Sequence, residues 1–363
     1  MKNTFGNNIS VTLFGESHGP AVGAVLDGLA PGMTVDESVI AQRLSLRRPQ
    51  GDVSTARSEK DPFVIESGVY NGKTTGTPLC ILIPNGDARP SDYEDMRFLP
   101  RPGHADYTGH IKYRGFEDPN GGGHFSGRIT AALCAAAAVL IPALEAKGIY
   151  TGSHIYRCAG VSDVPFSGSA EEIKKLNAKY FAVLDESAGE KMREKILAAA
   201  SGGDSVGGIV ETAITGLPAG IGEPWFDTVE GVLAHALFSV PAVKGVEFGA
   251  GFALADMRGS EANDPFVIKD GEIKTVSNNS GGVLGGITTG MPVLFRTVIK
   301  PTPTLRLPQD TVDLEKNENA VLAAKGRHDP CIVHRARAVI DSVAVIAVSD
   351  LLSTHFGADW LSL

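Results

Sequence analysis

One stretch without a charged side chain, residues 129–141, constrains the fold of this chain more than any other. It reads Ile-Thr-Ala-Ala-Leu-Cys-Ala-Ala-Ala-Ala-Val-Leu-Ile. Alanine favours helix, and a helix that is apolar on every side must be covered by protein on every side. We therefore expect a fully buried helix within residues 120–147. The run is shorter than a membrane span and is interrupted by Pro142, so we expect no membrane partner.

The segment before this helix combines flexibility with a cation. Residues 120–128 read Asn-Gly-Gly-Gly-His-Phe-Ser-Gly-Arg. Ser126 suits the N-cap position, and the glycines allow the backbone to approach another group closely. Arg128 in the first turn is unfavourable beside the positive end of the helix dipole unless an anion binds there. The alternative is a glycine loop before a core helix, with Arg128 pointing into solvent.

The chain resembles itself at two places. Residues 68–78 match residues 282–292 at Gly, Val, Gly, Thr, Thr, Gly and Pro, and residues 22–32 resemble residues 206–220. This pattern favours an internal duplication, in which each half is a sheet plus a buried helix. Chance similarity between Gly/Thr turns is the alternative.

From the duplication we predict an α+β fold: a β-α-β sandwich with a central helical layer between two mainly antiparallel sheets, related by a pseudo-twofold. We expect a single domain over residues 1–363, with halves at about 1–150 and 200–363. A charge-rich helical insertion at about 165–200 is expected between them.

Five residues carry local predictions. Thr34 is expected to cap a helix through a capping box, and Arg43 and Arg47 share one face of that helix. Their like charges require an anion or good solvation. Asp329, followed by Pro, is expected to cap the last helix. Phe226 is expected on the apolar face of a helix over residues 223–238.

Composition excludes several classes of protein. The net charge of −9 argues against a nucleic-acid or acidic-membrane partner. The four cysteines lie far apart, without zinc or disulfide spacing, and no secretory segment opens the chain. We therefore expect reduced thiols and a cytoplasmic location.

Four polar clusters stand on expected turns or helix starts, and each contains a histidine. They are residues 15–19, 101–106, 123–128 and 325–330. Arginines suit recognition of phosphate and carboxylate, and histidines beside them suit proton transfer to a leaving anion. For any one histidine, a structural or solvent-facing imidazole is the alternative. Metal-spaced histidine pairs and nucleotide-binding glycine motifs are absent from the sequence.

These clusters carry a family resemblance. Gly-Glu-Ser-His-Gly at 15–19 with Asp-Gly-Leu-Ala-Pro at 27–31, Ser-Gly-Arg at 126–128, and Arg-His-Asp-Pro-Cys at 327–331 resemble the three signature segments of chorismate synthases. Arg-Pro-Gly-His-Ala-Asp at 101–106 and Ala-Val-Lys-Gly-Val-Glu at 242–247 are also similar to that family. The resemblance runs from Phe14 to the last helix.

The resemblance implies a carbon–oxygen lyase acting on phosphates. Chorismate synthases convert 5-enolpyruvylshikimate 3-phosphate to chorismate by anti-1,4-elimination of phosphate, the last step of the shikimate pathway. They need reduced FMN, which is thought to pass an electron to the substrate transiently, and NADPH is a candidate reductant. The family is homotetrameric, with helices sandwiched between sheets.

The resemblance also implies roles for individual residues. The catalytic residues would be His18, protonating the departing phosphate, His104, protonating the reduced flavin, and Asp329, assisting proton removal there. The substrate's anionic groups would meet Ser17, Arg48, Arg57, Arg128 and Arg327. The cofactor contacts would be His124, Phe125, Ser126, Pro241, Ala242, Gly285, Lys300, Pro301, Thr302, Pro303, Thr304, Arg327 and, nearby, Arg47. No metal is implied. The chain departs from the common family pattern at His124 and Phe125.

Two other functions compete with this one. The first is a non-catalytic binding protein for phosphorylated ligands on the same fold. The second is a lyase or mutase that acts on a phosphorylated sugar acid without flavin.

Overall fold

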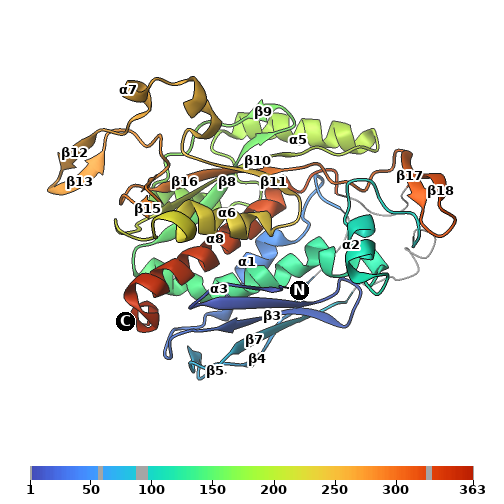
Figure 1. Cartoon of the computed structure of the whole chain (residues 1–363), viewed down its shortest axis with the longest axis horizontal. Helices are drawn as coiled ribbons and strands as arrows, with labels where there is room; N and C mark the ends of the chain where they lie inside the picture. The colour runs from blue at the N-terminus through green and yellow to red at the C-terminus, as the bar shows by residue number, and fades with distance from the viewer. Residues whose placement is uncertain (1, 56–59, 87–96, 324–328, 363) are drawn as a thin grey trace.

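The computed structural model describes residues 2–55, 60–86, 97–323 and 329–362. It has three main layers, in which helices lie between two sheets (Figure 1). The predicted α+β sandwich is confirmed, and the reason is the one anticipated: apolar helices need cover on both sides.

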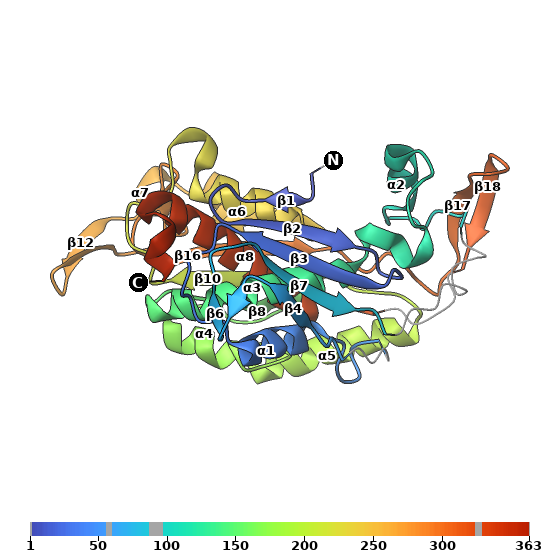
Figure 2. The same ribbon diagram turned by 90° about the horizontal axis from the view of Figure 1, so that it is seen from below.

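In the described part of the chain, two five-stranded antiparallel sheets form the outer layers. The first has the order β1-β2-β3-β7-β4 and faces the viewer in Figure 2. Its strands are β1 (Thr4–Phe5), β2 (Ser10–Gly15), β3 (Ala21–Asp27), β7 (Leu79–Pro84) and β4 (Val64–Ser67). The second has the order β11-β16-β10-β8-β9. Its strands are β11 (Val243–Phe248), β16 (Val293–Ile299), β10 (Gly208–Thr215), β8 (Tyr150–Cys158) and β9 (Val161–Ser162).

Four helices of the described chain form the central layer, and the others lie beside the second sheet or at the two ends of the molecule. The central layer contains α1 (Glu37–Arg47), α3 (Thr130–Ala146), α6 (Val229–Phe238) and α8 (Val333–Phe356). The charge-rich pair α4 (Ala170–Asn177) and α5 (Glu186–Ser201) lies beside the second sheet. At one end stand α2 (Asp106–Tyr113) and the hairpin β17 (Gln309–Asp313) with β18 (Glu318–Leu322). At the other end α7 (Gly259–Ala262) precedes the projecting hairpin β12 (Phe266–Lys269) with β13 (Glu272–Thr275).

Helix α3 is the buried helix predicted from its composition. Residues 130–140 are all buried, and the helix packs against α8, α1 and β3. The last turn, after Pro142, is partly exposed, and the helix continues through this proline to Ala146. Among the described residues, one stretch, Gly127–Ala146, is long and apolar enough to span a membrane, and 72% of the tested window is buried inside the protein.

Two hairpins support the internal duplication. Strands β5 (Val69–Tyr70) and β6 (Lys73–Thr74) in one half match β14 (Val283–Leu284) and β15 (Ile287–Thr288) in the other. The Thr74 hydroxyl donates to Ala30 O at 2.6 Å and accepts from Met33 N at 2.9 Å. The Thr288 hydroxyl donates to Pro218 O at 2.7 Å and accepts from Ile221 N at 2.9 Å. Equivalent threonines thus make equivalent bonds.

The strand orders agree as well. The order β2-β3-β7-β4 in the first sheet has the counterpart β8-β10-β16-β11 in the second. Helices α1 and α6 occupy equivalent places in the chain, as do α3 and α8. We infer that the second half begins at β8, near residue 150, so that the α4–α5 insertion lies inside it, between β9 and β10.

Three local predictions are corrected. The cap of α1 is Asp36, whose carboxylate accepts from Ser38 N at 2.8 Å, because Thr34 is held extended in a bridge with Lys73. Helix α8 begins at Val333 and Asp329 does not cap it. Helix α6 begins after residue 228, and Phe226 before it is 94% exposed.

The paired arginines of α1 are buried beside carboxylates. Arg43 Nη1 lies 3.2 Å from Asp341 Oδ2 of α8, and Arg47 Nη1 lies 3.2 Å from Asp61 Oδ2. The anions that this pair requires are therefore supplied by the protein itself. Asp341 also accepts a bond from the Ser153 hydroxyl of β8, so it joins the two halves across the helical layer.

A buried histidine links the α4–α5 insertion to the second sheet. His154 of β8 lies between Asp163 (Nδ1–Oδ2 2.8 Å) and Glu211 (Nε2–Oε2 2.9 Å), with no exposed side-chain surface. Asp163 in turn accepts from Leu184 N at 2.7 Å and Asp185 N at 2.8 Å, at the start of α5. The imidazolium thus places a positive charge between two buried carboxylates, and Arg296 pairs with Glu211 as well (Nε–Oε1 2.8 Å).

The duplicated threonines predict a matched pair of stability losses. Thr74→Val and Thr288→Val each leave a buried amide and a buried carbonyl without their side-chain partner. We expect each change to lower the free energy of unfolding by about 1–3 kcal/mol. Chemical denaturation at matched protein concentration measures both, with exposed Thr4→Val as the control. A loss in one half and none in the other would contradict equivalent roles.

The His154 network predicts a pH-dependent stability. Burial lowers the pKa of His154, but the bonds to Asp163 and Glu211 outweigh burial and raise it. A raised folded-state pKa stabilises the fold fully below the unfolded value of about 6.5 and less as pH rises through the folded value. We expect the stability lost in His154→Gln to be largest near about pH 6 and to shrink above about pH 6.5. A loss that does not change with pH would contradict this sign.

Candidate functional site

The glycine loop before α3 touches both histidines that the resemblance marks as catalytic. In the segment η2 (Asn120–Phe125), Gly121, Gly122 and Gly123 have φ values of 63°, 96° and 51°. A Cβ atom on Gly121 would lie 2.1 Å from His18 Cε1, and one on Gly122 would lie 2.9 Å from His104 Cε1. The loop needs glycine both for its backbone conformation and for these contacts.

The turn that carries His18 is bonded to the same loop. Ser17 N donates to Gly123 O at 3.1 Å, and the Ser17 hydroxyl donates to Asn120 O at 3.1 Å. His18 Nδ1 lies 2.9 Å from that hydroxyl. Because the one hydroxyl hydrogen is directed at a carbonyl, His18 Nδ1–H donates to Ser17 Oγ. Nε2 is then the nitrogen of His18 that can exchange a proton with a ligand.

Arg128 lies beside an anionic group, as predicted, and that group is a carboxylate of the protein itself. Its guanidinium pairs with Asp61 and also donates from Nε to Asn85 Oδ1 at 2.9 Å. Its side chain is 9% exposed, so it does not point into solvent. Asn85 Nδ2 donates to Glu16 O at 2.9 Å and Gly19 O at 2.8 Å, which brings the His18 turn beside Arg128.

Asp61 is shared by two arginines. It is 4% exposed, has a φ of 46° and bridges Arg128 and Arg47. A left-handed conformation in a residue other than glycine is unfavourable and is held by its surroundings. The bridge fixes two guanidinium groups side by side at the start of α3.

Asp329 is linked to Arg47 through a residue that the motifs did not mark. Asp329 Oδ1 accepts from Thr55 N at 2.9 Å, and Oδ2 pairs with Arg335 Nη1 at 2.6 Å. Arg335 Nε donates to Arg47 O at 2.8 Å. These contacts, rather than a helix cap, explain the position of Asp329.

The segment that follows β16 contacts the residue before His104. The Lys300 ammonium donates to Gly103 O, next to His104, and its backbone N–H donates to Ala242 O at 2.9 Å. Burial and nearby Lys244 lower the pKa of Lys300. Thr304, four residues on, lines a cavity of about 210 Å³ together with Asp329.

Contacts, the shared cavity and chain continuity connect these residues in a closed circuit, which we call the contact ring. Its members are, in order, His18, Asn85, Arg128, Asp61, Arg47, Arg335, Asp329, Thr304, Lys300, Gly103, His104, Gly122 and Gly121. The circuit connects His18, His104, Arg128 and Asp329, which lie in four separate parts of the sequence.

Some expected site residues lie beside the ring. Ser126 accepts from Arg128 N at 3.2 Å, as predicted for a cap, and His124 Nδ1 lies 2.8 Å from Gly15 O. Arg48 follows Arg47 and donates to Lys60 O at 2.7 Å. The remaining neighbours are Ser17 beside His18, Pro241 and Ala242 beside Lys300, and Pro301, Thr302 and Pro303 between Lys300 and Thr304.

Other expected residues lie elsewhere. Gly285 is in the β14–β15 turn, where neighbouring Gly286 O accepts from Val229 N at the start of α6, and β15 lies far from α2 in Figure 1. The Phe125 ring packs on α2 at Tyr113, 5.9 Å between centroids. Arg57 and Arg327 lie outside the described residues.

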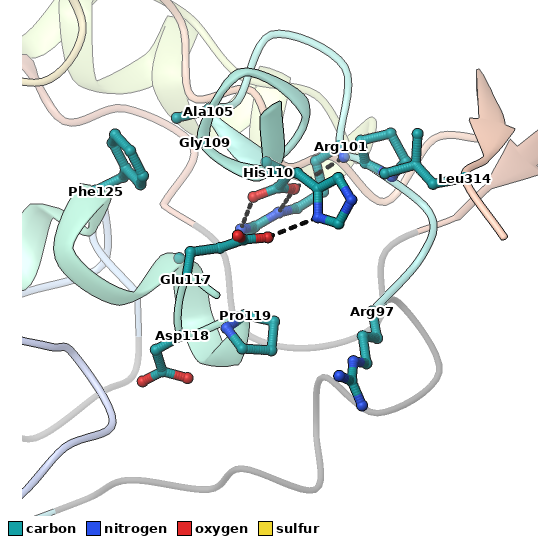
Figure 3. Close-up of a pocket in the computed structure, with 13 residues that line it drawn as sticks. Arg97, Arg101, Ala105, Gly109, His110, Glu117, Asp118, Pro119, Phe125 and Leu314 are labelled. Atoms are coloured by element: carbon teal, nitrogen blue, oxygen red, sulfur yellow. Dashed lines mark hydrogen bonds and ion pairs between the residues drawn. The ribbon is translucent and has the colours of Figure 1, made fainter. Parts of the chain in front are cut away.

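A hollow between α2 and the glycine loop is lined partly by charged side chains. Arg101, His110 and Glu117 point into it in Figure 3, and Gly122 of the contact ring also lines it. Its other lining residues are Arg97, Pro100, Ala105, Asp106, Gly109, Asp118, Pro119, Phe125 and Leu314.

Sequence reasoning missed several residues that build the site. Asp61, Asn85 and Arg335 have no local signal, because their roles depend on partners far away in the chain. Arg101 and Asp106 stood in a marked cluster, and their spacing around His104 was the available signal.

Comparison with known proteins points to one family. The family model described as chorismate synthase matches residues 9–352. A protein named chorismate synthase from Thermococcus kodakarensis is 47% identical over 96% of this chain and 96% of its own length, and one from Pyrococcus abyssi is 48% identical over the same shares.

A solved structure described as chorismate synthase superposes with a TM-score of 0.77 at 28% identity, covering 98% of this chain and 94% of that one. Family model, relatives and fold therefore agree, and this chain belongs to the chorismate synthase family.

Proposed function

We propose that this chain is an active chorismate synthase: a carbon–oxygen lyase that converts 5-enolpyruvylshikimate 3-phosphate to chorismate and phosphate. The observation that carries the proposal is the contact ring, in which two histidines and several cations surround one glycine loop. The retained His18, His104 and Asp329 disfavour a binding protein without turnover.

The cations suit a multiply charged substrate. Arg128 and Arg47 lie side by side on Asp61, and Arg48 follows in the chain. A buried anion needs charged, hydrogen-bonding partners to offset its lost hydration. We propose that Arg128, Arg48 and Ser17 meet the substrate's phosphate and carboxylates, as would Arg57 and Arg327 outside the described residues.

His18 is the proposed acid for the departing phosphate. Its Nδ1–H is engaged by Ser17, so the imidazolium presents its Nε2 proton to a ligand. Donation of that proton neutralises charge on the leaving group as the carbon–oxygen bond breaks. Asp329 is held by Thr55 N and Arg335, and we propose that it assists proton removal at the flavin.

The residues on the Lys300 side fit FMN. The Thr302 hydroxyl is buried and has no hydrogen-bond partner among the described residues, and the Lys300 ammonium can meet a phosphate. We propose that reduced FMN is held by His124, Ser126, Ala242, Arg47 and the segment 300–304. When bound, this cofactor supplies an electron transiently to the substrate. We propose that His104 supplies a proton to the cofactor through Nε2.

Further parts of the proposal rest on the family. We propose a homotetramer in the cytoplasm, with NADPH as a candidate source of reducing equivalents. Apolar side chains on the β12–β13 hairpin support assembly: Phe266, Ile268 and Ile273 are 66%, 78% and 71% exposed.

Turnover should depend on both the flavin and the two histidines. In an anaerobic assay of chorismate formation, we expect product with reduced FMN and none without it. His18→Ala and His104→Ala should each slow turnover about 10²-fold or more, the usual scale of acid–base help. His355→Ala, at the exposed end of α8, is the control. Turnover without flavin would refute the flavin requirement, and near-normal rates in both variants would remove the acid–base assignment.

The glycine loop should tolerate no added methyl group. In Gly121→Ala the Cβ atom would overlap the His18 ring at 2.1 Å, and alanine disfavours a φ of 63°. We expect turnover to fall about 10²-fold, because a small displacement of the acid is costly. The control is Gly259→Ala, where nothing lies within 4 Å of the added atom and φ is not positive. Wild-type turnover in Gly121→Ala would contradict the site geometry.

A further inference from the structure

Asp106, the first residue of α2, is bound tightly beneath His104. Its Oδ1 lies 2.6 Å from His104 Nδ1. Arg101 clamps the same carboxylate from its backbone N–H (2.9 Å), Nε (2.7 Å) and Nη2 (2.8 Å). Burial raises the pKa of Asp106, but the bonds from Arg101 and His104 outweigh it and hold that pKa far below its ordinary value. The carboxylate is therefore charged and can only accept hydrogen bonds.

These contacts decide which ring nitrogen of His104 carries the fixed hydrogen. Arg101 Nη2 also lies 3.2 Å from His104 Nδ1, and a guanidinium can only donate. Nδ1 cannot accept from Arg101 and donate to Asp106 at once. The contact with the carboxylate is shorter and charge-assisted, so Nδ1–H donates to Asp106. Nε2 is then left to face the glycine loop, where it would lie 3.3 Å from a Cβ atom on Gly122.

We propose that Asp106 is a positioning residue, which fixes the Nδ1–H tautomer and the ring orientation of His104 so that Nε2 exchanges the proton of the reaction. Arg101 supports it by holding the carboxylate in place. The inference rests on the proposed function for its catalytic part, whereas the tautomer can be measured on the protein alone.

His110 of α2 forms a matched pair with Glu117, which lies beyond the end of that helix, and this pair lacks such a role. His110 Nδ1 lies 2.9 Å from Glu117 Oε1, the same kind of imidazole–carboxylate contact, and both side chains line the hollow of Figure 3. His110 is not a member of the contact ring. Glu117→Gln is therefore the control for a carboxylate-to-amide change beside a histidine of α2.

The test is Asp106→Asn. The amide oxygen is retained at the Oδ2 position by Arg101 N and Nε, so the NH₂ group replaces Oδ1, faces His104 Nδ1 and should turn that nitrogen into an acceptor. Solid-state ¹⁵N spectra of histidine-labelled protein, taken where the imidazoles are neutral, distinguish protonated from unprotonated ring nitrogens. We expect Nδ1–H at His104 in the wild type and Nε2–H in Asp106→Asn. His104 is assigned by the signal lost in His104→Ala.

Turnover provides the second readout. In Asp106→Asn we expect kcat to fall about 10²-fold or more with KM little changed, because the ring would present the wrong nitrogen to the reaction. Asp106→Glu should recover part of this loss, and Glu117→Gln should retain wild-type turnover.

An unprotonated His104 Nδ1 in the neutral wild-type protein would overturn the inference, and so would wild-type kcat in a folded Asp106→Asn. A wild-type protein that forms no chorismate would instead refute the proposed function. The spectra test the tautomer in either case.

Discussion

The fold depends on one constraint: α3 has no polar face. Its residues 130–140 are buried, so helices and a sheet must cover it on every side. The duplicated sheet-and-helix halves supply that cover, and α8 of the second half packs directly on α3. Because the glycine loop enters α3 from the end of the layer, the position of this helix also determines where the loop meets His18 and His104.

Charge in the site is arranged around carboxylates that belong to the protein. Asp61 holds Arg128 and Arg47, Asp106 holds Arg101 and His104, and Asp329 holds Arg335. Each carboxylate compensates buried cations and fixes their direction before any ligand arrives. Preorganised cations need little reorganisation when an anion binds, which favours catalysis by electrostatic stabilisation.

The sequence predicted those features whose cause is local. The alanine run predicted the buried helix, and the repeated Gly/Thr segment predicted two related halves, whose Thr74 and Thr288 hydroxyls make equivalent bonds. Phe226 was wrongly placed on a helix because apolar periodicity does not reveal where a helix begins.

Ion pairs between residues far apart in the chain could not be predicted from local sequence patterns. The carboxylates opposite Arg43, Arg47 and Arg128 are 298, 14 and 67 residues away in the chain, so no spacing rule connects them. Asp329 resembled a helix cap, yet its carboxylate is used by Thr55 and Arg335. The four polar clusters marked the region of the site, and only the fold shows how they close into a ring.

The central claim is that one chain builds one binding region inside the contact ring. A crystal structure of the protein with FMN and 5-enolpyruvylshikimate 3-phosphate tests it most directly. The account predicts both ligands within the ring, with the substrate phosphate within hydrogen-bonding distance of His18 Nε2. Ligands bound outside the ring, or a phosphate remote from His18, would contradict it.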